Sequence, residues 1–122
     1  MSTRSEKLRE LLEGLSRGNP DILGSAIVSD EGLIVASFLP GDLDEHRISA
    51  ITAALRAVAD RAAQQIALGN VERIMMFAER GGAVICSGKL SSLIVLTRPD
   101  AKIGLVLMDV IEAVDKLRDV LG

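Results

Sequence analysis

The chain has 122 residues, a net charge of −3 at neutral pH, one cysteine and one histidine. One cysteine excludes an internal disulfide framework, and one histidine excludes a histidine-rich metal site. Aliphatic residues are abundant, which excludes an intrinsically disordered chain, but only 2% of residues are aromatic and none is Tyr or Trp. Single-strand nucleic-acid binders stack bases on aromatic side chains, so we expect no nucleic-acid partner.

The chain carries no apolar run long enough to cross a membrane, so no membrane insertion is expected. Residues 1–13 are charged throughout and lack the apolar centre of a signal peptide. The length suits one domain with a real core, spanning residues 1–122, and the cytoplasm is the expected location.

The first 40 residues predict a helix followed by a hairpin. Residues 3–6 fit the T-x-x-E capping box, and leucines then recur at helical spacing until Asn19 and Pro20 stop the helix. Two aliphatic runs follow, at residues 22–28 and 33–38, joined by the polar turn 29–32. This pattern is typical of two antiparallel strands.

A long helix is predicted over residues 45–68, with the acidic residues 44–45 at its start and Gly69-Asn70 as its stop. One of its stripes holds the large residues and is expected to face a sheet; it consists of Ile48, Ile51, Leu55, Val58, Ala59, Ala62 and Ile66. The opposite stripe holds Ala50, Ala53, Ala54 and Ala57. Two interpretations remain open for these alanines: a surface that lets a second helix approach closely, or a helix built from its best former.

Three more strands are predicted at residues 71–78, 83–87 and 93–97, linked by the turns 79–82 and 88–92. Asp100 is the expected N-cap of a last helix. Leu105 and Met108 lie off its core stripe, and we expect them to pack on the first helix rather than meet a partner. The core stripe itself is expected to hold Ile103, Val106, Leu107, Val110, Ile111, Val114, Leu117 and Leu121. The order α-β-β-α-β-β-β-α, with an antiparallel five-stranded sheet and helices on both faces, predicts a three-layer α/β/α sandwich of the α+β type.

Catalytic chemistry is sparse in this sequence. The cluster Asp42, Asp44, Glu45 and His46 suits either a metal or acid–base site or simply the acidic start of a helix, and we favour the helix start. Cys86 lies in a predicted strand with no histidine after it, so we interpret it as an inert buried thiol rather than a nucleophile. The turns 29–32 and 81–82 match no phosphate or calcium motif. We therefore expect no catalytic residue, metal or cofactor.

Residues 24–37, the alanine-rich helix and residues 98–105 together resemble the Roadblock/LC7 family. The resemblance implies a homodimer, or a pair with a Roadblock paralogue, in which central helices pack side by side and third strands pair. The interface residues it implies are Ala50, Ala53, Ala54, Ala57, Arg61, Ile74 and Met76. It also implies a small Ras-like GTPase as partner, whose hydrolysis can be stimulated without an inserted arginine finger. Arg47, Arg56 and Asp60 are the candidate residues for that contact.

Three hypotheses of function follow. The first is a dimeric regulator or scaffold of a small GTPase, and the second is a dimerisation adaptor with no effect on GTP hydrolysis. The third is a small-molecule sensor or enzyme similar to profilin-like or longin-like domains. The first is favoured, since the resemblance and the lack of catalytic residues both agree with it.

Overall fold

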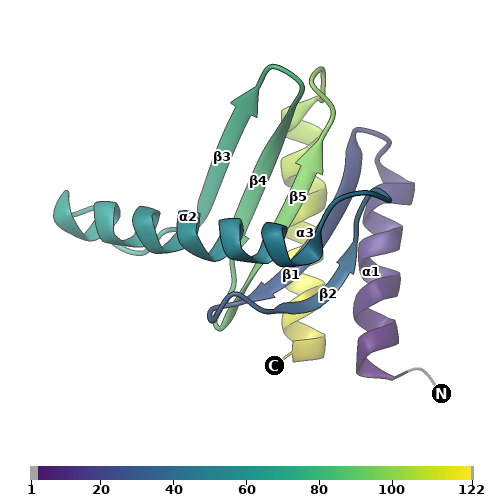
Figure 1. The fold of residues 1–122 in the computed structure, drawn as a ribbon, viewed down its shortest axis with the longest axis horizontal. Coiled ribbons are helices and arrows are strands. Elements are labelled where there is room, and N and C mark those ends of the chain that lie inside the picture. Colours follow the sequence, from purple (N-terminus) through teal and green to yellow (C-terminus); the bar gives the residue numbers. More distant parts are fainter. Residues whose placement is uncertain (1–2, 122) are drawn as a thin grey trace.

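The computed structural model describes residues 3–121 and has the predicted order of helices and strands. Five antiparallel strands form one sheet, with α1 and α3 on one face and α2 on the other (Figure 1). The three-layer α/β/α prediction is therefore confirmed. The elements are α1 (Arg4–Gly18), β1 (Ile22–Ser29), β2 (Ile34–Phe38), α2 (Glu45–Gln65), β3 (Arg73–Ala78), β4 (Gly81–Ser87), β5 (Ser91–Thr97) and α3 (Ile103–Leu121).

The sheet has the order β2-β1-β5-β4-β3. The predicted hairpin and three-stranded meander are both present, and they join where β1 pairs antiparallel with β5, placing Ala26 opposite Ile94. This arrangement leaves β2 and β3 at the two edges of the sheet. Within residues 3–121, β3 therefore has a strand partner on one side alone.

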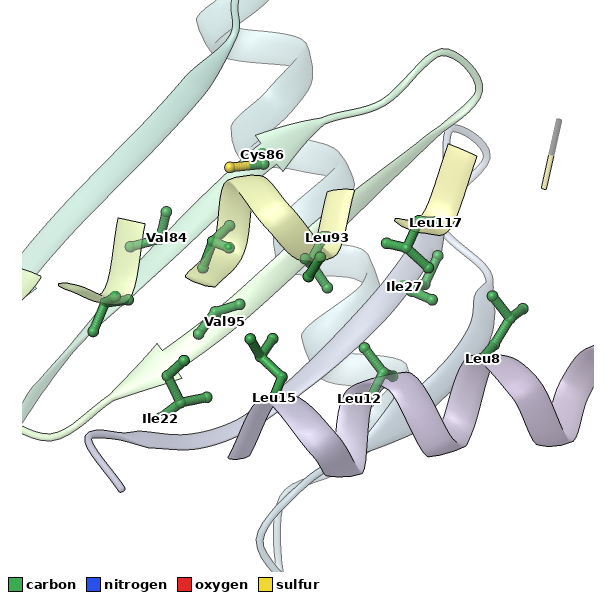
Figure 2. Packing of buried hydrophobic residues seen from close by; sticks show 13 residues of the cluster. Leu8, Leu12, Leu15, Ile22, Ile27, Val84, Cys86, Leu93, Val95 and Leu117 are labelled. Atoms are coloured by element: carbon green, nitrogen blue, oxygen red, sulfur yellow. The ribbon is translucent and has the colours of Figure 1, made fainter. Parts of the chain in front are cut away.

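The larger core lies between the sheet and the α1/α3 layer. Leu8, Leu12 and Leu15 point from α1 toward the sheet (Figure 2). They meet strand residues such as Val95 and the α3 residue Val110, both fully buried. A smaller cluster of Ala26, Val28, Ile85 and Ile94 lies on the other face, beneath α2.

The N-terminal ends of α1 and α2 begin as predicted, whereas the N-terminal end of α3 does not. Thr3 caps α1 by accepting from the Glu6 N–H at 3.1 Å, and Asp44 caps α2 by accepting from the His46 N–H at 2.9 Å. The prediction that Asp100 caps the last helix is wrong, because α3 begins three residues later at Ile103. A distant carboxylate serves this end instead: the Lys102 N–H donates to Asp21 Oδ2 at 3.0 Å.

The β3–β4 turn is tighter than predicted. It consists of residues 79–80, so Gly81 and Gly82 belong to β4 and lie beside β5. A Cβ atom on Gly81 would stand 2.7 Å from the Thr97 carbonyl oxygen, and one on Gly82 would stand 2.8 Å from its hydroxyl. These glycines therefore permit a close approach between strands.

The buried face of α3 is centred on Val106, Val110, Ala113 and Leu117. This places Ile111, predicted to be in the core, at 44% exposure. Leu105 and Met108 are 53% and 67% exposed, so the prediction that they pack on α1 is wrong. Among the described residues, no helix is both long and apolar enough to cross a membrane.

Candidate functional site

The face of α2 turned away from the sheet is largely apolar and exposed. Ile51 is 45% exposed and Val58 is 69% exposed, with small alanines between them. We call this surface the α2 outer face; its members are Ala50, Ile51, Ala54, Ala57, Val58 and Arg61. Removing such an apolar surface from water is favourable, so this surface is a candidate for burial against another protein.

The prediction that one stripe of α2 faces the sheet is wrong for four of its members, which are exposed: Ile51, Val58, Ala62 and Ile66. The helix is rotated by roughly one residue, or 100°, from the predicted orientation, so that Ser49 and Thr52 lie buried instead. Their hydroxyls donate to carbonyls one turn back: Ser49 Oγ to His46 O at 3.0 Å and Thr52 Oγ1 to Ile48 O at 2.7 Å. Because the helix itself satisfies these hydroxyls, burying them costs little.

Arg56 explains why α2 takes this orientation. Its side chain is 18% exposed, and its guanidinium contacts the two turns at this end of the sheet. Nη1 donates to Asp30 Oδ1 at 2.8 Å, to Ser92 Oγ at 3.0 Å and to Ser91 O at 3.1 Å, while Nη2 donates to Gly88 O at 3.3 Å. One side chain thus fastens α2 to the β1–β2 turn and to the β4–β5 segment.

The open edge of β3 carries the second exposed apolar group. Met75, Met76 and Phe77 are 48%, 44% and 68% exposed. Ile74 packs with the cluster beneath α2, and alternation places Met76 on the same face and Met75 and Phe77 on the other. An edge strand with apolar side chains and free backbone groups is a ready template for pairing with another chain.

The predicted interface residues divide between exposed and covered positions. Ala50, Ala54, Ala57, Arg61 and Met76 are exposed. Ala53 and Ile74 are half-buried: Ala53 lies against the β1–β2 turn near Gly32, and Ile74 lies beneath α2.

Sequence reasoning missed four exposed apolar residues of these surfaces: Ile51, Val58, Met75 and Phe77. For Ile51 and Val58 on α2, the available signal was the stripe of Ser49 and Thr52, whose short hydroxyl side chains can be buried when they bond to their own helix. For β3, the family resemblance implied pairing of the third strand, but the residues it named were Ile74 and Met76 on one face, and Met75 and Phe77 on the other face were left out.

The structure does not bring Arg47, Arg56 and Asp60 together on one surface. Arg47 is exposed, whereas Arg56 and Asp60 lie on the flank of α2 that faces the turns, with Arg56 Nε 3.7 Å from Asp60 Oδ2. Arg56 therefore already has partners within its own chain.

Catalytic groups remain sparse in three dimensions. Asp44 serves as the α2 cap, and within residues 3–121 no group of three or more His, Cys, Asp or Glu side chains is placed to hold a metal. Cys86 is 4% exposed. Burial raises the pKa of its thiol, and the nearby Arg73 opposes this only in part. A buried, protonated thiol is a poor nucleophile.

Comparisons with known proteins agree with this arrangement. The chain is 33% identical over 97 residues to uncharacterized protein MJ0310 of Methanocaldococcus jannaschii, covering 80% of this chain and 85% of that one. The crystal structure of a Roadblock/LC7 domain from Streptomyces avermitilis superposes with a TM-score of 0.87 at 17% identity, covering 93% and 96% of the two chains. Myxococcus xanthus MglB gives a TM-score of 0.88 at 17% identity, covering 94% of each chain.

These superpositions establish the fold, because their sequence identities are low. The sequence match is more specific: the family model described as "Roadblock/LC7 domain" matches residues 8–97, which include α2 and all five strands. The chain belongs to the Roadblock/LC7 family.

Proposed function

We propose that the protein is a dimeric regulator or scaffold of a small Ras-like GTPase, and that it dimerises through the α2 outer face and the open edge of β3. The observation that carries this proposal is the coincidence of two exposed apolar surfaces on neighbouring elements. Val58 on α2 is 69% exposed, and Met76, on the face of β3 that lies toward α2, is 44% exposed. Figure 1 shows α2 crossing the strands and extending past β3, beyond its own sheet.

A second copy related by a two-fold axis suits both surfaces at once. Pairing β3 with its counterpart would satisfy the free edge, and α2 would then pack against the partner's α2. Ala50, Ala54 and Ala57 are small enough to let the two backbones approach closely, while Ile51 and Val58 supply apolar area. A Roadblock paralogue with the same surfaces is the alternative partner.

The dimer proposal is tested by sedimentation velocity at micromolar concentration. We expect the wild type to sediment as a dimer and Val58→Glu as a monomer, since the two-fold axis places two carboxylates in one apolar interface. Met108→Glu is the matched control, because Met108 is 67% exposed on a helix of the opposite layer. A monomeric wild type would refute the homodimer, and equal effects of both variants would refute the interface.

The GTPase part of the proposal rests on family membership and on the sparse catalytic groups. The Arg56 guanidinium donates hydrogen bonds to Asp30 and to the carbonyls of Ser91 and Gly88 in its own chain. An arginine finger would need a free guanidinium, so this arrangement agrees with stimulation of hydrolysis without one. Arg47, in the first turn of α2, and Asp60, on the flank that faces the turns, are proposed as two separate contacts with the GTPase, and Arg56 contributes by positioning α2.

The test mixes the protein with a Ras-like GTPase from the same genome, loaded with GDP or with a non-hydrolysable GTP analogue. Complex formation is measured by light scattering after gel filtration, and phosphate release is measured with GTP. Failure to bind in either nucleotide state refutes the proposal. Binding with an unchanged hydrolysis rate supports the alternative, a dimerisation adaptor.

A further inference from the structure

We infer that a hollow at the end of the α1/α3 layer is a docking site for an acidic peptide segment that inserts one large apolar side chain. The hollow measures about 190 Å³ and lies among the N-terminus of α1, the C-terminal half of α3 and the β4–β5 turn. It lies on the sheet face opposite α2, so this inference is independent of the proposed dimer.

The interior of the hollow is apolar. Leu93 and Leu117, which are 2% and 6% exposed, line it together with the Cys86 side chain and Leu121 (Figure 2 shows the first three). At its mouth, Leu90 is 75% exposed on the β4–β5 turn. An exposed leucine beside an apolar hollow is a feature that a bound apolar group would stabilise.

The size of the hollow indicates what enters it. Pockets for drug-sized ligands measure roughly 300–1,000 Å³. A hollow of about 190 Å³ is smaller, and suits one large side chain of a peptide whose backbone stays outside.

The charge of the lining indicates what surrounds that side chain. Arg4, Lys89 and Arg118 line the hollow, all three exposed, and its lining includes no Asp or Glu. This local charge is opposite to the net charge of −3 of the whole chain. Within residues 3–121, Arg4 and Lys89 form no ion pair, and the pair of Arg118 with Asp115, at 3.3 Å, is highly exposed on both sides. Such cations attract acidic groups placed next to an inserted apolar anchor.

The test uses fluorescein-labelled peptides and measures anisotropy. Asp-Glu-Phe-Asp-Glu is expected to bind at least about tenfold more tightly than Asp-Glu-Ser-Asp-Glu, which lacks the anchor, and than Lys-Lys-Phe-Lys-Lys, which reverses the charge. Its affinity should fall several-fold as salt is raised, because the three cations are exposed. Absence of binding at millimolar peptide, or equal binding of the serine peptide, would overturn the inference.

Protein variants locate the binding. Lys89→Glu and Leu90→Ser are each expected to weaken the Phe peptide at least about fivefold, because one reverses the rim charge and the other removes the apolar mouth. Lys116→Glu on α3 is the matched control, since Lys116 lies outside the hollow's lining, and it should leave binding unchanged. All three residues are exposed, so unchanged thermal unfolding curves will verify that the variants fold.

Two other occupants give different results. If vesicles of phosphatidylserine bind in a Lys89-dependent manner and the Phe peptide does not compete, the surface recognises lipid and the peptide assignment is wrong. If Lys89→Glu abolishes self-association, the occupant is a second copy. The monomeric variant Val58→Glu should retain peptide binding, which separates this inference from the dimer proposal.

Discussion

Replacing Arg56 with Met is the sharpest test of how α2 is held in place. The substitution keeps most of the apolar stem but removes the guanidinium, which donates to Asp30, Gly88, Ser91 and Ser92. α2 would then lose its polar attachment to both turns, but it would keep the small cluster around Ile48 and Leu55 and the hydrogen bond that Ser37 donates to Glu45.

The magnitude can be worked out contact by contact. Asp30 is 43% exposed, so its ion pair with Arg56 contributes at most about 1 kcal/mol. The remaining hydrogen bonds, to Ser92 Oγ and to the carbonyls of Ser91 and Gly88, contribute about 2 kcal/mol together, because the two hydrogens of Nη1 are shared among three acceptors. Because water can reach part of this region after the substitution, we expect a loss of about 3 kcal/mol in the free energy of unfolding. That is a large share of the roughly 5–15 kcal/mol that stabilises a typical domain.

The assay is urea unfolding followed by circular dichroism. Arg17→Met is the matched control: this arginine is 76% exposed and has a single ion pair, to Glu13 at 3.4 Å, so its loss should cost less than about 0.5 kcal/mol. Asp30→Ala isolates the ion pair and should cost about 1 kcal/mol. If Arg56→Met proves as stable as Arg17→Met, the attachment of α2 by Arg56 is refuted.

Three further outcomes follow from the packing. Gly24→Ala should destabilise the fold by about 1–3 kcal/mol in urea unfolding, because its Cβ would stand 2.7 Å from Phe38 O, whereas Gly14→Ala, which meets open space on α1, should stabilise by up to about 1 kcal/mol. Thr52→Val should change stability by less than about 1.5 kcal/mol, since the lost hydroxyl bonds only its own helix; a larger loss would show that the hydroxyl has another role. Burial raises the pKa of the Cys86 thiol above 9.0, so the unfolded chain releases this proton first, and stability declines as the pH rises past about 9. That decline, followed by urea unfolding at several pH values, should be shallower in Cys86→Ala; parallel curves would contradict the assignment.

Local signals sufficed to predict the elements. The Thr3 cap, the Asn19-Pro20 stop and the Asp44 cap each act on neighbouring backbone, so their effects can be deduced from a few consecutive residues. The Asp100 cap failed for the complementary reason: the carboxylate that serves α3 comes from Asp21, 81 residues away from Lys102. The pairing of β1 with β5 is equally long-range, and no local pattern specifies it.

The candidate site was predicted in part, because apolar periodicity treats every polar residue as exposed. On α2 that assumption fails at Ser49, Thr52 and Arg56, which all face the interior side of the helix and have partners there. The displaced apolar residues, Ile51 and Val58, then face outward. The same rotation of α2 therefore has two results: it gives the polar side chains hydrogen-bond partners, and it leaves the apolar side chains exposed.

The interior place of β1, between β2 and β5, has a consequence for synthesis on the ribosome. Its partner β5 begins at Ser91, 62 residues after β1 ends at Ser29. At roughly 5–20 residues per second, that delay lasts about 3–12 s. During this interval α1, β1 and β2 can assemble, but the inner edge of β1 has no partner and is open to pairing with other nascent chains. Completion of β5 closes that edge, so the last strand made is the one that joins the two halves of the sheet.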